Sequence, residues 1–179
     1  IEEVVIGRDL KNSIFRRNIV LTKVVFGNKI KNIPYEAFYG CSNLSSVDLS
    51  NVESIGNGAF ASTKLENVEI PAQLSYLGTS VFSDCTSLTR VSIKANITSI
   101  PNGCFQGCSS LSSVEYPASV AVIGESAFSG CGFTSFKLNG NVTEIQREAF
   151  SSCKNLENME WGNVSLIGFN AFEDCGFKE

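Results

Sequence analysis

The sequence has no histidine. Without an imidazole group it can form neither a Ser-His-Asp triad nor a Cys-His dyad, and the usual zinc sites with histidine ligands are excluded too. Basic runs are also missing, and 14 Lys and Arg against 18 Asp and Glu leave a net charge of -4. We therefore expect no nucleic-acid partner, because nucleic acids need a basic surface. No apolar stretch approaches the roughly 18 to 20 residues of a membrane-spanning helix, so we expect no membrane insertion.

The sequence does contain enough apolar material for one folded domain, since 43% of its 179 residues are hydrophobic and 18% are charged. Phenylalanine recurs along the chain at intervals of 22 or 23 residues. The recurring residues are Phe15, Phe38, Phe60, Phe82, Phe105, Phe128, Phe150 and Phe172. So constant an interval indicates internal repeats, which stack into a solenoid.

Two further sets of equivalent positions are apolar in every repeat from Phe38 onward. Five residues before each Phe stand Ile33, Ile55, Leu77, Ile100, Ile123, Ile145 and Ile167. Three residues further upstream stand Ile30, Val52, Leu74, Ile97, Val120, Val142 and Val164. We expect these positions and the repeating phenylalanines to form the core.

The repeat phenylalanines from Phe15 to Phe150 are each followed by the pattern L-x-x-V-x-I or an apolar variant of it, as in Leu88, Val91 and Ile93. The last two apolar positions alternate with a polar residue, which predicts a short strand with one buried face. Because the same return path follows every strand, consecutive strands pair in parallel in a single curved sheet. The return path I-G-x-x-A-F-x-x-C, as in residues 123–131, spaces its inward residues three or four apart. That spacing favours a short helix or helical turn.

Together these positions give C-x-x-L-x-x-V-x-I-P-x-x-V-x-x-I-G-x-x-A-F, which resembles the BspA-type leucine-rich repeat. Residues 108–128 match this pattern from end to end, and the resemblance covers nearly the whole chain. It implies a right-handed leucine-rich repeat superhelix of about eight turns, with one curved parallel β-sheet and short helical or turn return segments. Proteins with this repeat are mostly exported or cell-surface proteins of bacteria and protozoa linked to adhesion and host contact. The resemblance thus implies an extracellular or cell-surface location, with any signal or anchor outside the sequence.

The repeats organise residues 1–179 as a single domain. Residues 1–20 form a degenerate repeat, with Ile14 in place of Ala and Asn18 in place of Cys. Extra charge at Arg8, Asp9 and Lys11 fits an N-terminal cap over the core. At the other end, residues 175–177 begin a repeat that we expect to be incomplete.

The seven cysteines could form disulfides, bind a metal or pack as free thiols. Six lie three residues after the repeat Phe: Cys41, Cys85, Cys108, Cys131, Cys153 and Cys175. Thr63 fills this position once, and Cys104 replaces the small residue before Phe105. These are inward positions, so we expect a ladder of buried free thiols. Strained disulfides and a metal site at the C-x3-C pair of Cys104 and Cys108 are the alternatives.

Four sequons occur, at Asn43, Asn96, Asn141 and Asn163. In each of them a buried aliphatic residue stands between the Asn and the Ser or Thr. The repeat pattern therefore produces the motif almost automatically, and we interpret these residues as polar turn positions. Glycosylation is the alternative, and it requires a eukaryotic secretory pathway.

The outward positions of the predicted strands form a polar face that is locally charged around Arg90, Lys94, Glu115 and Lys137. These four residues lie on three successive turns, and their spacing suits several weak contacts along a large partner. They are our candidate binding residues. The small polar side chains that dominate the face offer neither a deep pocket nor a calcium cage.

Three functions remain. We favour a non-enzymatic module that binds a protein or extracellular-matrix macromolecule through the extended sheet face, acting as a monomer and without a cofactor. A structural spacer within a larger surface protein is the alternative. An enzyme is a distant third, because the acidic pair Asp48 and Glu69 has neither a cleft nor a nucleophile beside it.

Overall fold

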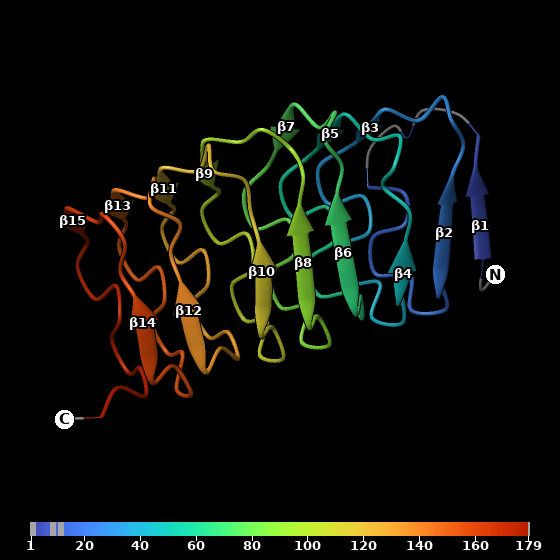
Figure 1. Ribbon diagram of the computed structural model, residues 1–179. Helices are drawn as coiled ribbons and strands as arrows, with labels where there is room; N and C mark the ends of the chain where they lie inside the picture. Colours follow the sequence, from blue (N-terminus) through green and yellow to red (C-terminus); the bar gives the residue numbers. More distant parts are fainter. Residues whose placement is uncertain (1–2, 8–9, 11–12, 179) are drawn as a thin grey trace.

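The computed structural model describes residues 3–7, 10 and 13–178. Its strands stack side by side into an elongated solenoid with the N-terminus at one end and the C-terminus at the other (Figure 1). Every strand pair is parallel, as the repeat predicts. The described residues make seven complete turns, with eight strands on one side and seven on the other, against about eight turns expected. None of the described segments is a helix that could cross a membrane.

Eight strands, all but β4 three or four residues long, follow one side of the solenoid and form what we call the first ladder. It comprises β1 (Glu3–Ile6), β2 (Lys23–Phe26), β4 (Ser46–Val47), β6 (Asn67–Ile70), β8 (Arg90–Ile93), β10 (Ser113–Glu115), β12 (Ser135–Lys137) and β14 (Asn158–Glu160). Equivalent residues lie opposite one another, so that Val91 in β8 pairs with Val68 in β6 and with Val114 in β10. The alternating pattern of the sequence thus becomes one buried and one exposed face.

A second ladder runs along the turns, and the expectation of one sheet was wrong in this respect. It comprises β3 (Asn32–Ile33), β5 (Ser54–Ile55), β7 (Tyr76–Leu77), β9 (Ser99–Ile100), β11 (Val122–Ile123), β13 (Glu144–Ile145) and β15 (Leu166–Ile167). Each strand ends at the aliphatic residue five positions before the repeat Phe. Strands of two residues are too short to show an alternating pattern in the sequence.

Both ladders are divided. The second consists of β3-β5-β7 and β9-β11-β13-β15, and the first consists of β1-β2-β4, β6-β8-β10 and β12-β14. Both breaks in the first ladder fall where the repeat is one residue shorter before the strand. Thr63 and Cys131 stand two residues before the first apolar position of the L-x-x-V-x-I pattern, whereas Cys41 and Cys108 stand three residues before it. In the first ladder, the interruptions of the strand pairing thus coincide with the shortened connections.

The return path is a series of tight turns, which is the turn alternative of the prediction, and the described chain contains no short helix there. In every repeat from Phe38 onward, the residues two before and two after the Phe have positive φ, as Ser80 (53°) and Asp84 (57°) do around Phe82. The N–H of Phe82 donates to the carbonyl of Cys104 in the next turn at 2.9 Å, and equivalent bonds recur along the stack. These donors hold the turns together, and an α-helix would consume them within its own segment.

The core is a single stack of inward side chains whose centre is the phenylalanine column. Consecutive rings from Phe15 to Phe172 lie 5.3 to 5.7 Å apart, and most are nearly parallel. From Phe38 to Phe150 the repeat phenylalanines are fully buried, as are Ile55, Ile100, Ile123 and Ile145.

The last turn departs from the expected core, because no further turn packs on it in the described chain. Ile167 is 50% exposed, and Phe172 and Cys175 are only partly buried. At the other end, Phe15 is partly buried and Ile14 is exposed. The charged positions Arg8, Asp9 and Lys11 of the expected cap lie outside the described residues.

Candidate functional site

The first ladder places the four candidate binding residues on its exposed face. Arg90 begins β8, Lys94 directly follows it, Glu115 ends β10 and Lys137 ends β12. All four are exposed, because they occupy outward positions of strands whose alternate residues face the core. They therefore share one face of the solenoid, in the segment of Figure 1 that runs from β8 to β12.

Both lysines are engaged by a glutamate of the following turn. Lys94 Nζ lies 4.0 Å from Glu115 Oε2, and Lys137 Nζ lies 2.7 Å from Glu160 Oε2. The hydrogen bond to Glu160 raises the pKa of Lys137 above its ordinary value. The sequence reasoning did not assign Glu160 to the site, although this residue occupies the equivalent position one repeat after Lys137.

Arg90 differs from the two lysines, because it forms no ion pair with any residue that the structure describes. Its guanidinium group can therefore bind a carboxylate of a partner without first breaking an ion pair within the described chain. Between β12 and β14, Lys137 and Glu160 are among the residues that line a hollow of about 350 Å³. The site is thus a charged, open surface.

The six repeat cysteines face the core and bind the backbone of the preceding turn. Their Sγ atoms lie 2.9 to 3.2 Å from the carbonyl oxygens of Phe15, Phe60, Phe82, Phe105, Phe128 and Phe150. Thr63 bonds the carbonyl of its own repeat Phe at 2.9 Å. The cysteine is thus a small apolar residue that also supplies a weak donor to a buried carbonyl.

Burial raises the pKa of these thiols, to about 11 for Cys85 and about 12 for Cys153. It also raises the pKa of Cys104 and Cys108 well above the ordinary range. Nucleophilic and metal-binding cysteines need the thiolate form, which these surroundings disfavour. Within the described residues no three His, Cys, Asp or Glu side chains form a group that could hold a metal ion.

The acidic pair of the enzymatic alternative stays exposed. Asp48 accepts a hydrogen bond from the N–H of Ser50 at 2.9 Å, as in a local turn, and Glu69 lies on the outer face of β6. Neither residue lines the hollow between β12 and β14 or any of three other polar hollows on the surface of the described residues. This geometry gives no support to acid-base chemistry at the pair.

All four sequon asparagines are exposed. The side-chain amides of Asn43, Asn141 and Asn163 donate to carbonyl oxygens of the preceding turn at 2.6, 2.9 and 2.6 Å. These three residues therefore act as links between turns. Asn96 makes no such bond to any described residue.

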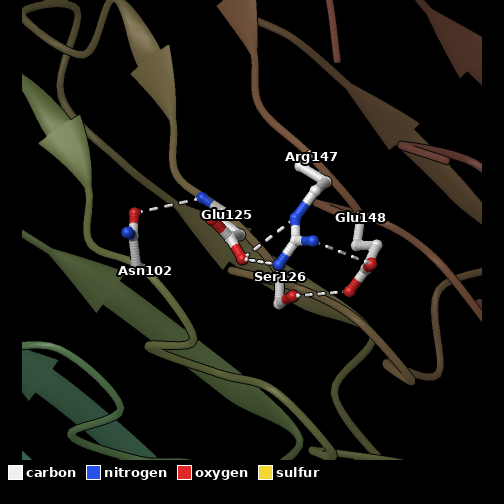
Figure 2. Close-up of polar contacts among 5 residues, drawn as sticks. All are labelled: Asn102, Glu125, Ser126, Arg147 and Glu148. Atoms are coloured by element: carbon white, nitrogen blue, oxygen red, sulfur yellow. Dashed lines mark hydrogen bonds and ion pairs between the residues drawn. The ribbon is translucent and has the colours of Figure 1, made fainter. Parts of the chain in front are cut away.

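A polar network that the sequence reasoning missed spans three turns on the side of the second ladder (Figure 2). Arg147 donates from Nε to Glu125 Oε1 at 3.1 Å, donates again to that oxygen from its terminal nitrogen, and lies 3.9 Å from Glu148. Glu125 N–H donates to Asn102 Oδ1 at 3.1 Å. The residue type at these positions varies from repeat to repeat, as Thr79, Glu125 and Arg147 show, so no sequence pattern marked them.

Comparison with known families agrees with the repeat architecture. The family model described as BspA type Leucine rich repeat region matches the chain in six copies, over residues 8–131 and 85–179. None of the curated proteins matches significantly.

Several solved bacterial structures share the fold. A leucine-rich repeat protein from Bacteroides ovatus is 28% identical, with a TM-score of 0.75, and the match covers 93% of this chain and 50% of that one. A leucine rich cell surface protein from Faecalibacterium prausnitzii is 26% identical, with a TM-score of 0.73, over 92% and 48% of the two chains. A leucine-rich repeat protein from Eubacterium ventriosum is 19% identical, with a TM-score of 0.77, and the match covers 99% of this chain and 60% of that one. At this identity the likeness shows the fold alone. The chain spans about half the length of the first two proteins.

Proposed function

Because the chain belongs to the BspA-type leucine-rich repeat family, we propose that it is a non-enzymatic, surface-exposed or secreted module that binds another macromolecule. The partner is a protein, such as a component of an extracellular matrix, and the binding surface is the exposed face of the first ladder. The observation that carries this proposal is the row of exposed charges on β8, β10, β12 and β14, with Arg90 free of an ion pair among the described residues.

The surface location is supported by a relative. The Faecalibacterium prausnitzii protein of the same fold is described as a cell surface protein. Open, repetitive and polar surfaces of solenoids commonly serve as extended binding surfaces. The proposal extends that location and use to this chain.

The composition of the face sets the expected strength of binding. It has charges and small polar side chains but no buried aromatic anchor, and such anchors dominate tight interfaces. We expect a dissociation constant on the order of micromolar for one module, and a higher overall affinity when many copies share a surface. Binding should weaken as salt is added, because exposed charge pairs are screened.

The test exchanges Arg90, Lys94 and Lys137 together for Glu and measures binding to immobilised collagen, laminin and fibronectin. The matched control exchanges Lys29, Lys64 and Lys154 for Glu, three exposed lysines without an ion pair among the described residues. Both variants change the net charge equally, and their melting temperatures show whether they fold.

The proposal predicts that the parent and the control bind at least one matrix protein and that the first-ladder variant does not. Equal binding by all three proteins would place the site elsewhere. If the parent binds none of the matrix proteins, the spacer function is favoured.

A further inference from the structure

A second surface, on the side of the second ladder, is hollowed and polar. A hollow of about 360 Å³ lies over three successive turns there. Its lining includes Thr79, Ser80, Asn102, Gly103, Gln106 and Glu125, and none of its lining side chains is apolar. A Cβ on Gly103, in its left-handed conformation, would meet Ser80 Oγ at 2.9 Å, so the glycine leaves the space open.

Several polar groups of the hollow have no partner among the described residues. The side chains of Thr79, Ser80 and Gln106 make no hydrogen bond to another described residue. Arg147 binds only Oε1 of the Glu125 carboxylate, which leaves Oε2 as an acceptor. The surface therefore presents donors and acceptors together, as a ligand rich in hydroxyl groups requires, because each hydroxyl both donates and accepts.

The charges of the hollow disfavour an anionic ligand. Glu125 is its one charged lining residue, and the nearby guanidinium of Arg147 lies between Glu125 and Glu148 (Figure 2). A phosphate or sulfate would meet a carboxylate and find a cation that is already paired.

An added peptide strand is disfavoured as well. The backbone N–H groups of Ser80, Gly103 and Ser126 donate to carbonyls of the following turn at 2.9, 2.8 and 3.0 Å. A peptide that pairs with a sheet edge needs free backbone groups, and an irregular peptide needs an apolar pocket for an anchor. The hollow offers neither.

An aromatic ring stands close to Thr79, one of the residues that line the hollow, because Asn57 Oδ1 accepts hydrogen bonds both from the N–H of Thr79, at 3.0 Å, and from the hydroxyl of Tyr76. Tyr76 is 54% exposed, and its hydroxyl donates to Asn57 Oδ1 at 3.2 Å. This hydrogen bond fixes the position of the Tyr76 ring, which lies three residues before Thr79 in the sequence and is partly exposed to solvent. An aromatic ring beside donors and acceptors is the combination that receives a sugar, because a pyranose has an apolar C–H face and a hydroxyl rim.

We propose that this surface, with Tyr76 as a platform and Gln106 and Glu125 as hydrogen-bonding residues, binds a neutral oligosaccharide that runs across successive turns. The site is separate from the first-ladder face and does not depend on it. It would let the module hold a glycan on one side while a protein occupies the other.

The experiment is isothermal titration of the full chain with cellohexaose, laminarihexaose, mannohexaose and xylohexaose, and with a heparin hexasaccharide as the charged probe. We expect at least one neutral hexasaccharide to bind. Tyr76→Ala and Gln106→Ala should each weaken that binding about tenfold or more. Tyr76→Phe keeps the ring and should retain most of the affinity.

The control is Tyr35→Ala, which removes a tyrosine that is 61% exposed and lies two turns from Tyr76. This variant should bind like the parent, and so should the first-ladder variant with Glu at Arg90, Lys94 and Lys137. The proposal is overturned if no neutral hexasaccharide binds, if only the heparin probe binds, or if Tyr76→Ala and Tyr35→Ala lose affinity equally.

Discussion

The phenylalanine of each repeat is the residue on which the stack depends most. A central ring such as Phe105 lies between two others, 5.7 Å from Phe82 and 5.6 Å from Phe128, and is fully buried. Phe15 stacks on one ring of the column, at 5.5 Å, and is only partly buried. One residue type in one position therefore contributes differently along the solenoid.

Phe105→Ala should lower the free energy of unfolding by about 3 to 5 kcal/mol, because it leaves a cavity between two packed turns. Phe15→Ala should lower the free energy of unfolding clearly less, because it removes only one stacking contact and less buried surface. Urea unfolding followed by circular dichroism gives both values. Equal losses at the two positions would contradict the stacked-repeat explanation of stability.

The thiols of the ladder should be reduced in the folded protein. Cys85, Cys108, Cys131 and Cys153 are buried, and each Sγ faces a phenylalanine carbonyl. We expect a thiol reagent to modify these four residues only after denaturation. Intact mass with and without reductant is the check, because disulfides would add two hydrogens per bond on reduction.

Stability should fall in alkaline solution because of the same thiols. Burial raises the pKa of Cys85 to about 11, above the ordinary value of 9.0 that it regains on unfolding. The neutral thiol is thus favoured in the folded state, and its contribution is complete below pH 9 and lost as the pH rises towards 11. The melting temperature should therefore drop between pH 9 and pH 11. In Cys85→Ala this drop should be smaller, and an equal drop would assign it to other groups.

The strands and turns differ in how far the sequence predicted them. The L-x-x-V-x-I pattern predicts the strands of the first ladder, because residues such as Val91 and Ile93 alternate with polar ones. The return path could not be assigned to one of the two structures, because a spacing of three or four residues fits tight turns as well as a helix. What distinguishes the two is the positive φ of residues such as Ser80 and Asp84, which the sequence pattern does not show.

Gly124 shows how closely neighbouring turns approach. A Cβ on this residue would lie 2.6 Å from the carbonyl oxygen of Ile100 and 2.9 Å from the backbone nitrogen of Asn102. Gly124→Ala should therefore destabilise the protein by about 1 to 3 kcal/mol, because backbone must move. Gly140→Ala is the matched control, since its Cβ would meet only Asn163 Nδ2 at 3.7 Å. Chemical denaturation measures the free energy of unfolding of both variants. Similar losses of stability at the two positions would contradict the close approach of the turns at Gly124.

At the scale of the whole molecule, the sequence identified the exposed face but not its contacts. Arg90 and Lys137 are predicted to point outward because they alternate with buried residues. The pair of Lys137 with Glu160 joins residues 23 positions apart and depends on the register of adjacent turns. The hollow near Gln106 needs three turns in place, and no single repeat contains it. Properties of one repeat were therefore predictable, whereas properties that arise between repeats required the structure.

The C-terminal turn should unfold before the centre, since an inner turn packs on two neighbours and this one packs on a single neighbour in the chain. Trp161, the only tryptophan, reports on it through its edge-to-face contact with Phe172 at 5.0 Å. We expect the fluorescence of Trp161 to change at a lower urea concentration than the circular dichroism of the strands. Phe172→Ala should move the fluorescence transition further down and leave the circular dichroism midpoint nearly unchanged, whereas Phe105→Ala should lower both. Coincident transitions in the parent would show instead that all the turns unfold as one cooperative unit.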